Sequence, residues 1–115
     1  MNDWTSGVAR IVVHTCARCG TSWYLPHERC PSCWSREYGS AAAAGTGMCV
    51  AATRLHVTAD GGEPVALALA ELDEGVLVLG HAEPGLRPGD RIQVHFGPSG
   101  PDAGAPLAPA FRRPA

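Results

Sequence analysis

Two pairs of closely spaced cysteines constrain this chain more than any other feature of its sequence. Cys16 and Cys19 form one C-x-x-C pair, Cys30 and Cys33 form the second, and ten residues separate the pairs. Two residues between thiolates allow both sulfurs to face one metal ion while the backbone turns around it. Two such pairs supply a tetrahedral set of four sulfurs, which suits zinc. The spacing therefore predicts a zinc ribbon over residues 16–38.

The residues beside the pairs support a structural metal site, and two other interpretations stay open. Gly20 gives a permissive backbone after the first pair, and Pro31 stiffens the second. Because cysteines fill all four positions, no site remains for water or substrate, and one structural Zn²⁺ per chain is expected. Iron in the same sulfur cage, as in rubredoxins, is one alternative. Disulfides are the other, but a reducing compartment disfavours them.

Composition argues against several classes of protein. Hydrophobic residues make up 45% of the 115 residues and charged residues 17%, so the chain is able to bury a core. No stretch of about 18 apolar residues occurs, which argues against a transmembrane helix. The first seven residues lack the basic start and the apolar run of a signal peptide. We therefore expect a cytoplasmic protein with reduced cysteines.

Short apolar runs between turn residues predict a β-rich fold. Alternation and apolar character predict strands at residues 8–15, 48–57, 65–72, 76–80 and 91–96. Pro-Gly and Asp-Gly steps break the chain between several of these runs. No segment of ten or more residues has a convincing helical period. Several short strands at this spacing predict a small β-barrel or sandwich.

The chain is expected to divide into four parts. They are an N-terminal strand with its lead-in at 1–15, the ribbon at 16–38, the barrel at 45–97 and a Pro-rich C-terminal tail at 98–115. The prolines from residue 98 onward are expected to exclude regular structure. Phe111, the one large aromatic residue of the tail, leaves open that this segment docks back on the body.

Four apolar residues in or beside the ribbon are candidates for partner binding. They are Trp23, Tyr24, Leu25 and Trp34. One interpretation is a hydrophobic lid over the metal site. The other is a partner-binding surface, since exposed aromatic residues are favoured interface anchors.

No catalytic residues are predicted. Cys49 lies within an apolar run and reads as a buried, inert thiol. No His-Asp pair, G-x-S-x-G elbow or Gly-rich phosphate loop accompanies it.

The order of these motifs resembles the zinc-ribbon and OB-fold proteins that associate with acyl-CoA enzymes, long catalogued as a domain of unknown function. The resemblance covers nearly the whole chain. It is carried by Trp4 and Gly7 before the first strand, the two cysteine pairs, Gly45-Thr46-Gly47, Leu72-Asp73-Glu74-Gly75, Pro88-Gly89-Asp90 and Pro109-Ala110-Phe111-Arg112.

The resemblance implies a rubredoxin-like zinc ribbon followed by a five-stranded OB-fold barrel. The fifth barrel strand is expected from a bend in the first, near Gly45 and Gly47, or from a segment that the pattern does not reveal. The resemblance also implies a non-catalytic accessory subunit of an acyl-CoA or acyl-carrier processing complex, in lipid or polyketide metabolism. Its partner would be a thiolase-fold enzyme (a thiolase, aldolase or acyltransferase) or a MaoC-like hydratase, in a hetero-oligomer.

Two functions of other classes stay open. OB-fold barrels commonly bind single-stranded nucleic acid, through stacking aromatics and a basic groove. The net charge of −2 and the pI of about 6.2 argue against nucleic-acid binding. The expected barrel also lacks the residues for such a groove, because the only aromatic residue in 47–96 is Phe96 and the only lysine or arginine residues are Arg54, Arg87 and Arg91. The other function is electron transfer by a rubredoxin-like iron site.

Overall fold

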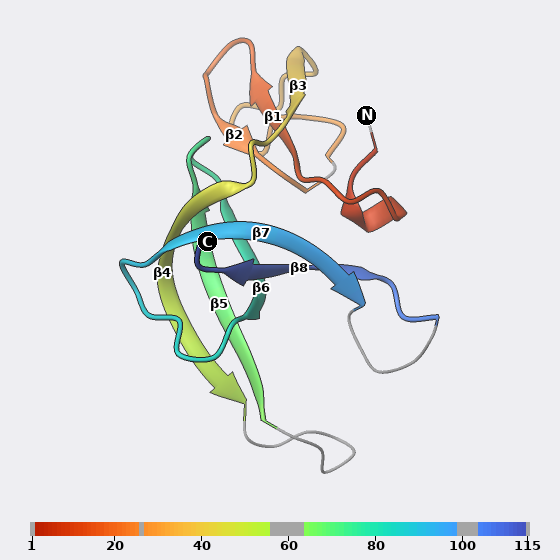
Figure 1. Ribbon diagram of the computed structural model, residues 1–115. Coiled ribbons are helices and arrows are strands. Elements are labelled where there is room, and N and C mark those ends of the chain that lie inside the picture. The colour runs from red at the N-terminus through yellow and green to blue at the C-terminus, as the bar shows by residue number, and fades with distance from the viewer. Residues whose placement is uncertain (1, 26, 56–63, 99–103, 115) are drawn as a thin grey trace.

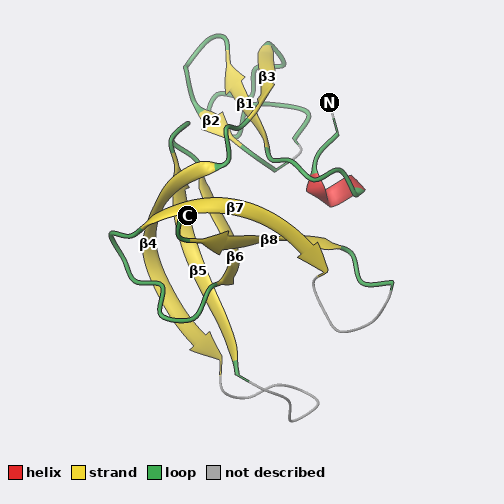
Figure 2. Cartoon of the chain, in the orientation of Figure 1, coloured by secondary structure: helices red, strands yellow, loops and turns green. Residues whose placement is uncertain are grey.

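The computed structural model describes residues 2–25, 27–55, 64–98 and 104–114, and these form two sheets (Figures 1 and 2). The N-terminal sheet has the strand order β2-β1-β3, with β1 at Val12–Cys16, β2 at Ser22–Trp23 and β3 at Tyr38–Ala42. A closed five-stranded barrel follows. The one helix within the described residues is a 3-10 turn, η1, at Trp4–Ser6. The predicted fold class, a mainly β chain with a cysteine ribbon before a five-stranded barrel, is confirmed.

The barrel closes because its first strand is long and bent. Its strands are β4 at Thr46–Leu55, β5 at Val65–Leu72, β6 at Leu77–Ala82, β7 at Arg91–Pro98 and β8 at Leu107–Arg112, in the order β4-β5-β6-β8-β7. β4 pairs with β5 along its length and with β7 over its first three residues, and its register shifts between Cys49 and Ala51. A β-carbon at Gly47 would collide with the Glu71 carbonyl oxygen, so only glycine allows β4 to cross β5 this closely.

The expectation that prolines exclude regular structure after residue 97 is wrong. β8 pairs antiparallel with β7 from Leu107 to Arg112 and parallel with β6 at Ala110 and Phe111. At Pro109 one side of β8 has no paired strand, so the missing N–H of proline costs no ladder hydrogen bond there. β8 is the fifth strand that the sequence pattern does not reveal. The division of the chain into four parts stays a prediction.

Two strands of the N-terminal sheet differ from the expected pattern. The strand expected at 8–15 begins only at Val12. β3 falls in an Ala-rich segment that was not expected to be a strand, because its sequence has no alternation of apolar and polar residues. In the structure, four of its five residues are exposed. In the barrel, the last two residues of the strand expected at 48–57 lie outside the described residues.

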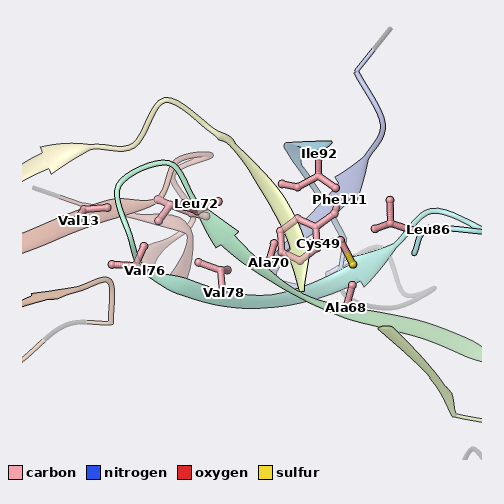
Figure 3. Close-up of a cluster of buried hydrophobic side chains, with 11 residues drawn as sticks. Val13, Cys49, Ala68, Ala70, Leu72, Val76, Val78, Leu86, Ile92 and Phe111 are labelled. Atoms are coloured by element: carbon pink, nitrogen blue, oxygen red, sulfur yellow. The ribbon is translucent and has the colours of Figure 1, made fainter. Parts of the chain in front are cut away.

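One hydrophobic core joins the barrel to the N-terminal sheet. Phe111, Ile92, Val78 and Cys49 are fully buried at its centre (Figure 3). Ile11 and Val13, from β1 and the residue before it, belong to the same buried cluster, and Trp4 and Tyr24 pack against it. The ribbon is therefore held against the barrel by apolar contacts as well as by the chain connection.

Replacement of the Phe111 ring should open the barrel. Phe111→Ala removes a fully buried aromatic side chain, and we expect a loss of about 3–5 kcal/mol in the free energy of unfolding. Urea denaturation measures this loss. The neighbouring exposed residue provides a control, since Arg112→Ala is expected to change stability by no more than about 0.5 kcal/mol. Equal stabilities of the two variants would mean that the C-terminal segment is not part of the barrel.

Candidate metal centre

The two cysteine pairs occupy turns of the same geometry. Cys16 ends β1, and its carbonyl oxygen accepts a hydrogen bond of 3.1 Å from the Gly20 N–H. In the loop between β2 and β3, the Cys30 carbonyl oxygen accepts one from the Trp34 N–H at 3.0 Å. The backbone therefore turns in the same way after each pair, and each turn directs two sulfurs to one side.

The four sulfurs converge on one point. The Sγ atoms of Cys16, Cys19, Cys30 and Cys33 all lie within 4.8 Å of one another. The Sγ atoms of Cys16 and Cys33 are 3.6 Å apart, and those of Cys19 and Cys30 are 3.5 Å apart. Sulfurs at about 2.3 Å from a tetrahedral zinc are separated by about 3.8 Å, whereas a disulfide bond measures about 2.05 Å. The cluster fits a metal ion such as zinc and not a pair of disulfides.

Hydrogen bonds favour the thiolate form that a metal requires. The backbone N–H groups of Cys19 and Arg18 donate to the Cys16 Sγ, at 3.5 and 3.4 Å, and these bonds, led by that from Cys19, lower the pKa of the Cys16 thiol. The Ser32 N–H donates to the Cys30 Sγ at 3.4 Å. Hydrogen bonds with the Thr21 side chain and backbone lower the pKa of Cys19 to about 6. Metal ions bind cysteine as thiolate, so the cost of deprotonation is lowered at Cys16 and Cys19. At Cys33 the hydrogen bond with the Ser35 backbone is outweighed by the side-chain contacts with the other cysteines, which raise its pKa to about 11.

Aromatic residues cover the inner side of the site. Cys16 and Cys30 are buried, whereas Cys19 and Cys33 are exposed. Trp23, which is 7% exposed, shares a small buried cluster with Cys16 and Cys30, and Tyr38 packs against it with ring centroids 5.3 Å apart. Trp23 and Tyr38 form a hydrophobic lid over the inner side of the site, and Trp23 is the one member of this lid among the four residues for which the sequence offered that interpretation.

The candidate partner-binding residues lie in different environments. Trp23 is buried in the lid and has little surface left for a partner. Tyr24 is partly buried against the barrel core. Leu25 is 44% exposed and Trp34 is 70% exposed. Contact with a partner stays a prediction for all four residues.

The histidines near the cysteines are not drawn into the cluster. His14 lies on β1 with its Nδ1 2.6 Å from the Ser40 Oγ, in a hydrogen bond across to β3. Burial lowers the pKa of His14, which favours the neutral ring. The side chain is therefore occupied within the sheet and adds no ligand to the four sulfurs.

The fifth cysteine is remote from this chemistry. Cys49 is completely buried in the barrel core, and its thiol donates to the Ala51 carbonyl oxygen at 3.4 Å. Burial raises the pKa of Cys49, which opposes formation of the nucleophilic thiolate. Its environment matches the expected inert thiol.

Sequence reasoning missed three residues that shape the surface around the site. Tyr38 reads as a residue after the ribbon, and only its pairing opposite Cys16 brings it to the lid. Leu77 and Leu79 read as ordinary members of an apolar strand. The sequence did contain a signal for the two leucines, because the run Val76-Leu77-Val78-Leu79 is apolar at every position. Only one face of a barrel strand points inward, so alternate residues of such a run must be apolar and exposed.

A solved structure described as the Ltp2–ChsH2(DUF35) aldolase matches this arrangement of ribbon and barrel. The match has a TM-score of 0.71 and 28% sequence identity, and it covers 90% of this chain and 84% of that chain. The chain is similar in fold and in sequence to this DUF35 protein. The resemblance inferred from the motifs is thereby confirmed, with the four-cysteine cluster and the OB-like barrel in the expected order.

A second DUF35 structure shares the fold at lower identity. It is a protein of unknown function from Sulfolobus solfataricus, with a TM-score of 0.59 and 18% identity, and the match covers 74% of this chain and 67% of that chain. No protein-family model matches the sequence, and no curated protein matches it. The similarity to DUF35 proteins therefore depends on the shared fold, the shared sequence with the aldolase component and the cysteine cluster.

Loss of one ligand should release the metal from this chain. Cys30→Ala removes one of the four converging sulfurs, and we expect the metal content to fall from about one ion per chain to nearly none, with loss of ordered structure in the ribbon. Elemental analysis of the purified protein and near-UV circular dichroism measure these two effects.

Cys49→Ala is the matched control, since both variants remove one buried thiol and only Cys30 belongs to the cluster. The control is expected to retain the metal. A stable Cys30→Ala protein that still holds a full complement of zinc would contradict the assignment of the ligands.

Proposed function

We propose that this chain is a non-catalytic accessory subunit of an acyl-CoA or acyl-carrier processing complex. It docks on a thiolase-fold enzyme such as a thiolase, aldolase or acyltransferase, or on a MaoC-like hydratase. One structural Zn²⁺, held by Cys16, Cys19, Cys30 and Cys33, maintains the ribbon. The complex acts in lipid or polyketide metabolism, and its place is the cytoplasm.

The observation that carries this proposal is the match to the DUF35 component of an aldolase. It extends over 90% of this chain, so both ribbon and barrel take part in it. A match over 90% of the chain at 28% identity supports a related function more strongly than a match of the barrel alone would.

The chemistry of the described residues supports a role without catalysis. The two exposed thiols belong to the four-cysteine cluster, where a bound metal occupies them. The remaining thiol, Cys49, is buried and bonded to a backbone carbonyl oxygen. A nucleophile needs an adjacent base and access to substrate, and Cys49 has neither among the residues described.

The barrel surface argues against a nucleic-acid groove. Arg91 is engaged by Asp73, whose two carboxylate oxygens each lie 3.1 Å from a guanidinium nitrogen. Phe96 is partly buried against the core, so little of its ring is left for stacking on a base.

Within the described residues, none of the helices has the length and apolar character to cross a membrane.

Partner binding is the direct test of this proposal. The chain should be co-expressed with the thiolase-fold or MaoC-like enzymes encoded beside it, and the product examined by size-exclusion chromatography with metal analysis of each peak. We expect co-elution with one such enzyme, with about one zinc per copy of this chain. The same enzyme without this chain is the control, and we expect lower stability or lower yield of it.

Two outcomes would contradict the proposal. Elution of the chain alone, with iron, would favour electron transfer by a rubredoxin-like site. Elution alone with zinc, together with salt-sensitive binding to single-stranded nucleic acid, would favour the other alternative.

A further inference from the structure

The exposed apolar side chains of this protein are not scattered over its surface. Within the described residues, the large hydrophobic side chains that remain exposed are Leu25, Trp34, Met48, Val50, Leu77 and Leu79. Single exposed apolar residues need no explanation, but contiguous ones mark interaction sites. The strand register and the surface hollows connect five of them, Met48, Leu77, Leu79, Leu25 and Trp34, and this surface is here called the apolar face.

The barrel half of the apolar face crosses three strands. Leu79 on β6 pairs with Leu69 on β5, and Leu77 pairs with Glu71, which in turn pairs with Met48 on β4. Paired residues in antiparallel strands have side chains on the same side, about 4.5–5.5 Å apart at their β-carbons. The inward positions between them, such as Val78 and Ala70, are buried. The outer side of this sheet is therefore largely apolar, where a solvated antiparallel sheet is usually polar.

The ribbon half continues from this sheet without a break. A hollow of about 380 Å³ between ribbon and barrel is lined by Tyr24 and Leu25 on one side and by Leu77 on the other. His27 and Pro31 line this hollow and also a second one, of about 550 Å³, whose far wall includes Trp34. Glu28 and Arg29 also line the second hollow, so the surface from Leu79 to Trp34 is a series of adjoining hollows that combine apolar and charged residues.

Trp34 occupies a backbone position that suits glycine. Its φ is 66°, and it is the one residue other than glycine with a positive φ among those described. The equivalent position after the first cysteine pair is Gly20, with a φ of 78°. A bulky residue in this conformation is strained, and the Trp34 side chain recovers little of that cost by burial because it is 70% exposed. Neither conformation nor packing within this chain explains a tryptophan here.

Glu71 is a charge inside the barrel half of the apolar face and restricts what covers it. It stands between Met48 and Leu77, and none of the ion pairs among the described residues includes it. Covering a carboxylate without a partner is costly, so the covering surface must bring a basic group to it. The occupant follows from the proposed function, which rests on the match to the DUF35 component of an aldolase and supplies a different protein as the partner.

We propose that the apolar face is the docking surface for the enzyme partner, which offers it an apolar surface with an arginine or lysine opposite Glu71. Trp34 and Leu79 anchor the two ends of the contact, on ribbon and barrel respectively. The inference rests on the proposed function, since it names the surface through which that partner is held.

The test measures the affinity of the zinc-loaded chain for its co-purified enzyme partner by biolayer interferometry. Leu79→Glu places a charge at one end of the face, and we expect the dissociation constant to rise at least about tenfold. Gln93→Glu, at an exposed position on β7, adds the same charge outside the face and should leave the constant unchanged. Glu71→Arg is expected to weaken binding through repulsion of the opposing basic group.

Trp34→Gly separates docking from folding. Glycine relieves the positive φ, so the variant should keep its metal and should unfold at a temperature no lower than that of the wild type. Its dissociation constant for the enzyme should nevertheless rise at least about tenfold, because an exposed anchor is lost. Reduced metal content together with weaker binding would instead assign Trp34 a structural role and remove it from the docking surface.

The outcomes distinguish this inference from the proposed function. If the wild-type chain binds the enzyme and the Leu79→Glu and Glu71→Arg variants bind as tightly as Gln93→Glu, the docking surface is elsewhere and the accessory function stands. If the wild-type chain binds none of the acyl-processing enzymes, both proposals fail. If the chain self-associates and Leu79→Glu abolishes that association, the occupant of the face is a second copy.

Discussion

The convergence of four cysteine sulfurs, a cluster suited to a metal ion such as zinc, is the constraint on which the N-terminal half of this protein depends. The ribbon spans little more than twenty residues, and among its described residues the buried cluster consists of Cys16, Trp23 and Cys30. So few apolar residues cannot offset the conformational entropy of folding, and small domains of this kind gain stability from metal binding. Backbone hydrogen bonds to Cys16 lower its pKa and favour the thiolate needed for that role.

The barrel is stable by different means and in turn supports the ribbon. A closed sheet leaves no edge strand exposed, and Phe111 and Ile92 fill its interior. Because Ile11 and Val13 enter the same core, the position of the ribbon is fixed relative to β5 and β6. A partner that contacts both Trp34 and Leu79 therefore meets a preformed surface, and the entropy lost on binding is smaller than for two loosely tethered modules.

The parts that the sequence predicted are those governed by local patterns. The cysteine ligands follow from spacing within a few residues, and strands such as β5 and β7 follow from alternation or apolar runs. β8 was missed because its stability comes from pairing with β6 and β7, which its own residues do not reveal, whereas prolines near Phe111 argue locally against a strand. The apolar face was missed because inward and outward positions of β6 are both leucine or valine, and only the closed barrel decides which of them are exposed.

The most direct test is whether partner binding depends on the metal, because the account predicts that metal binding folds the ribbon and that the folded ribbon forms half of the docking surface. The metal-free chain, prepared with a chelator under reducing conditions, should be titrated with zinc while tryptophan fluorescence and binding to the enzyme partner are recorded together. Both signals are predicted to rise in parallel and to reach a plateau at about one zinc per chain. Full partner binding by the metal-free chain, with the ribbon still unfolded, would contradict a metal-dependent docking surface.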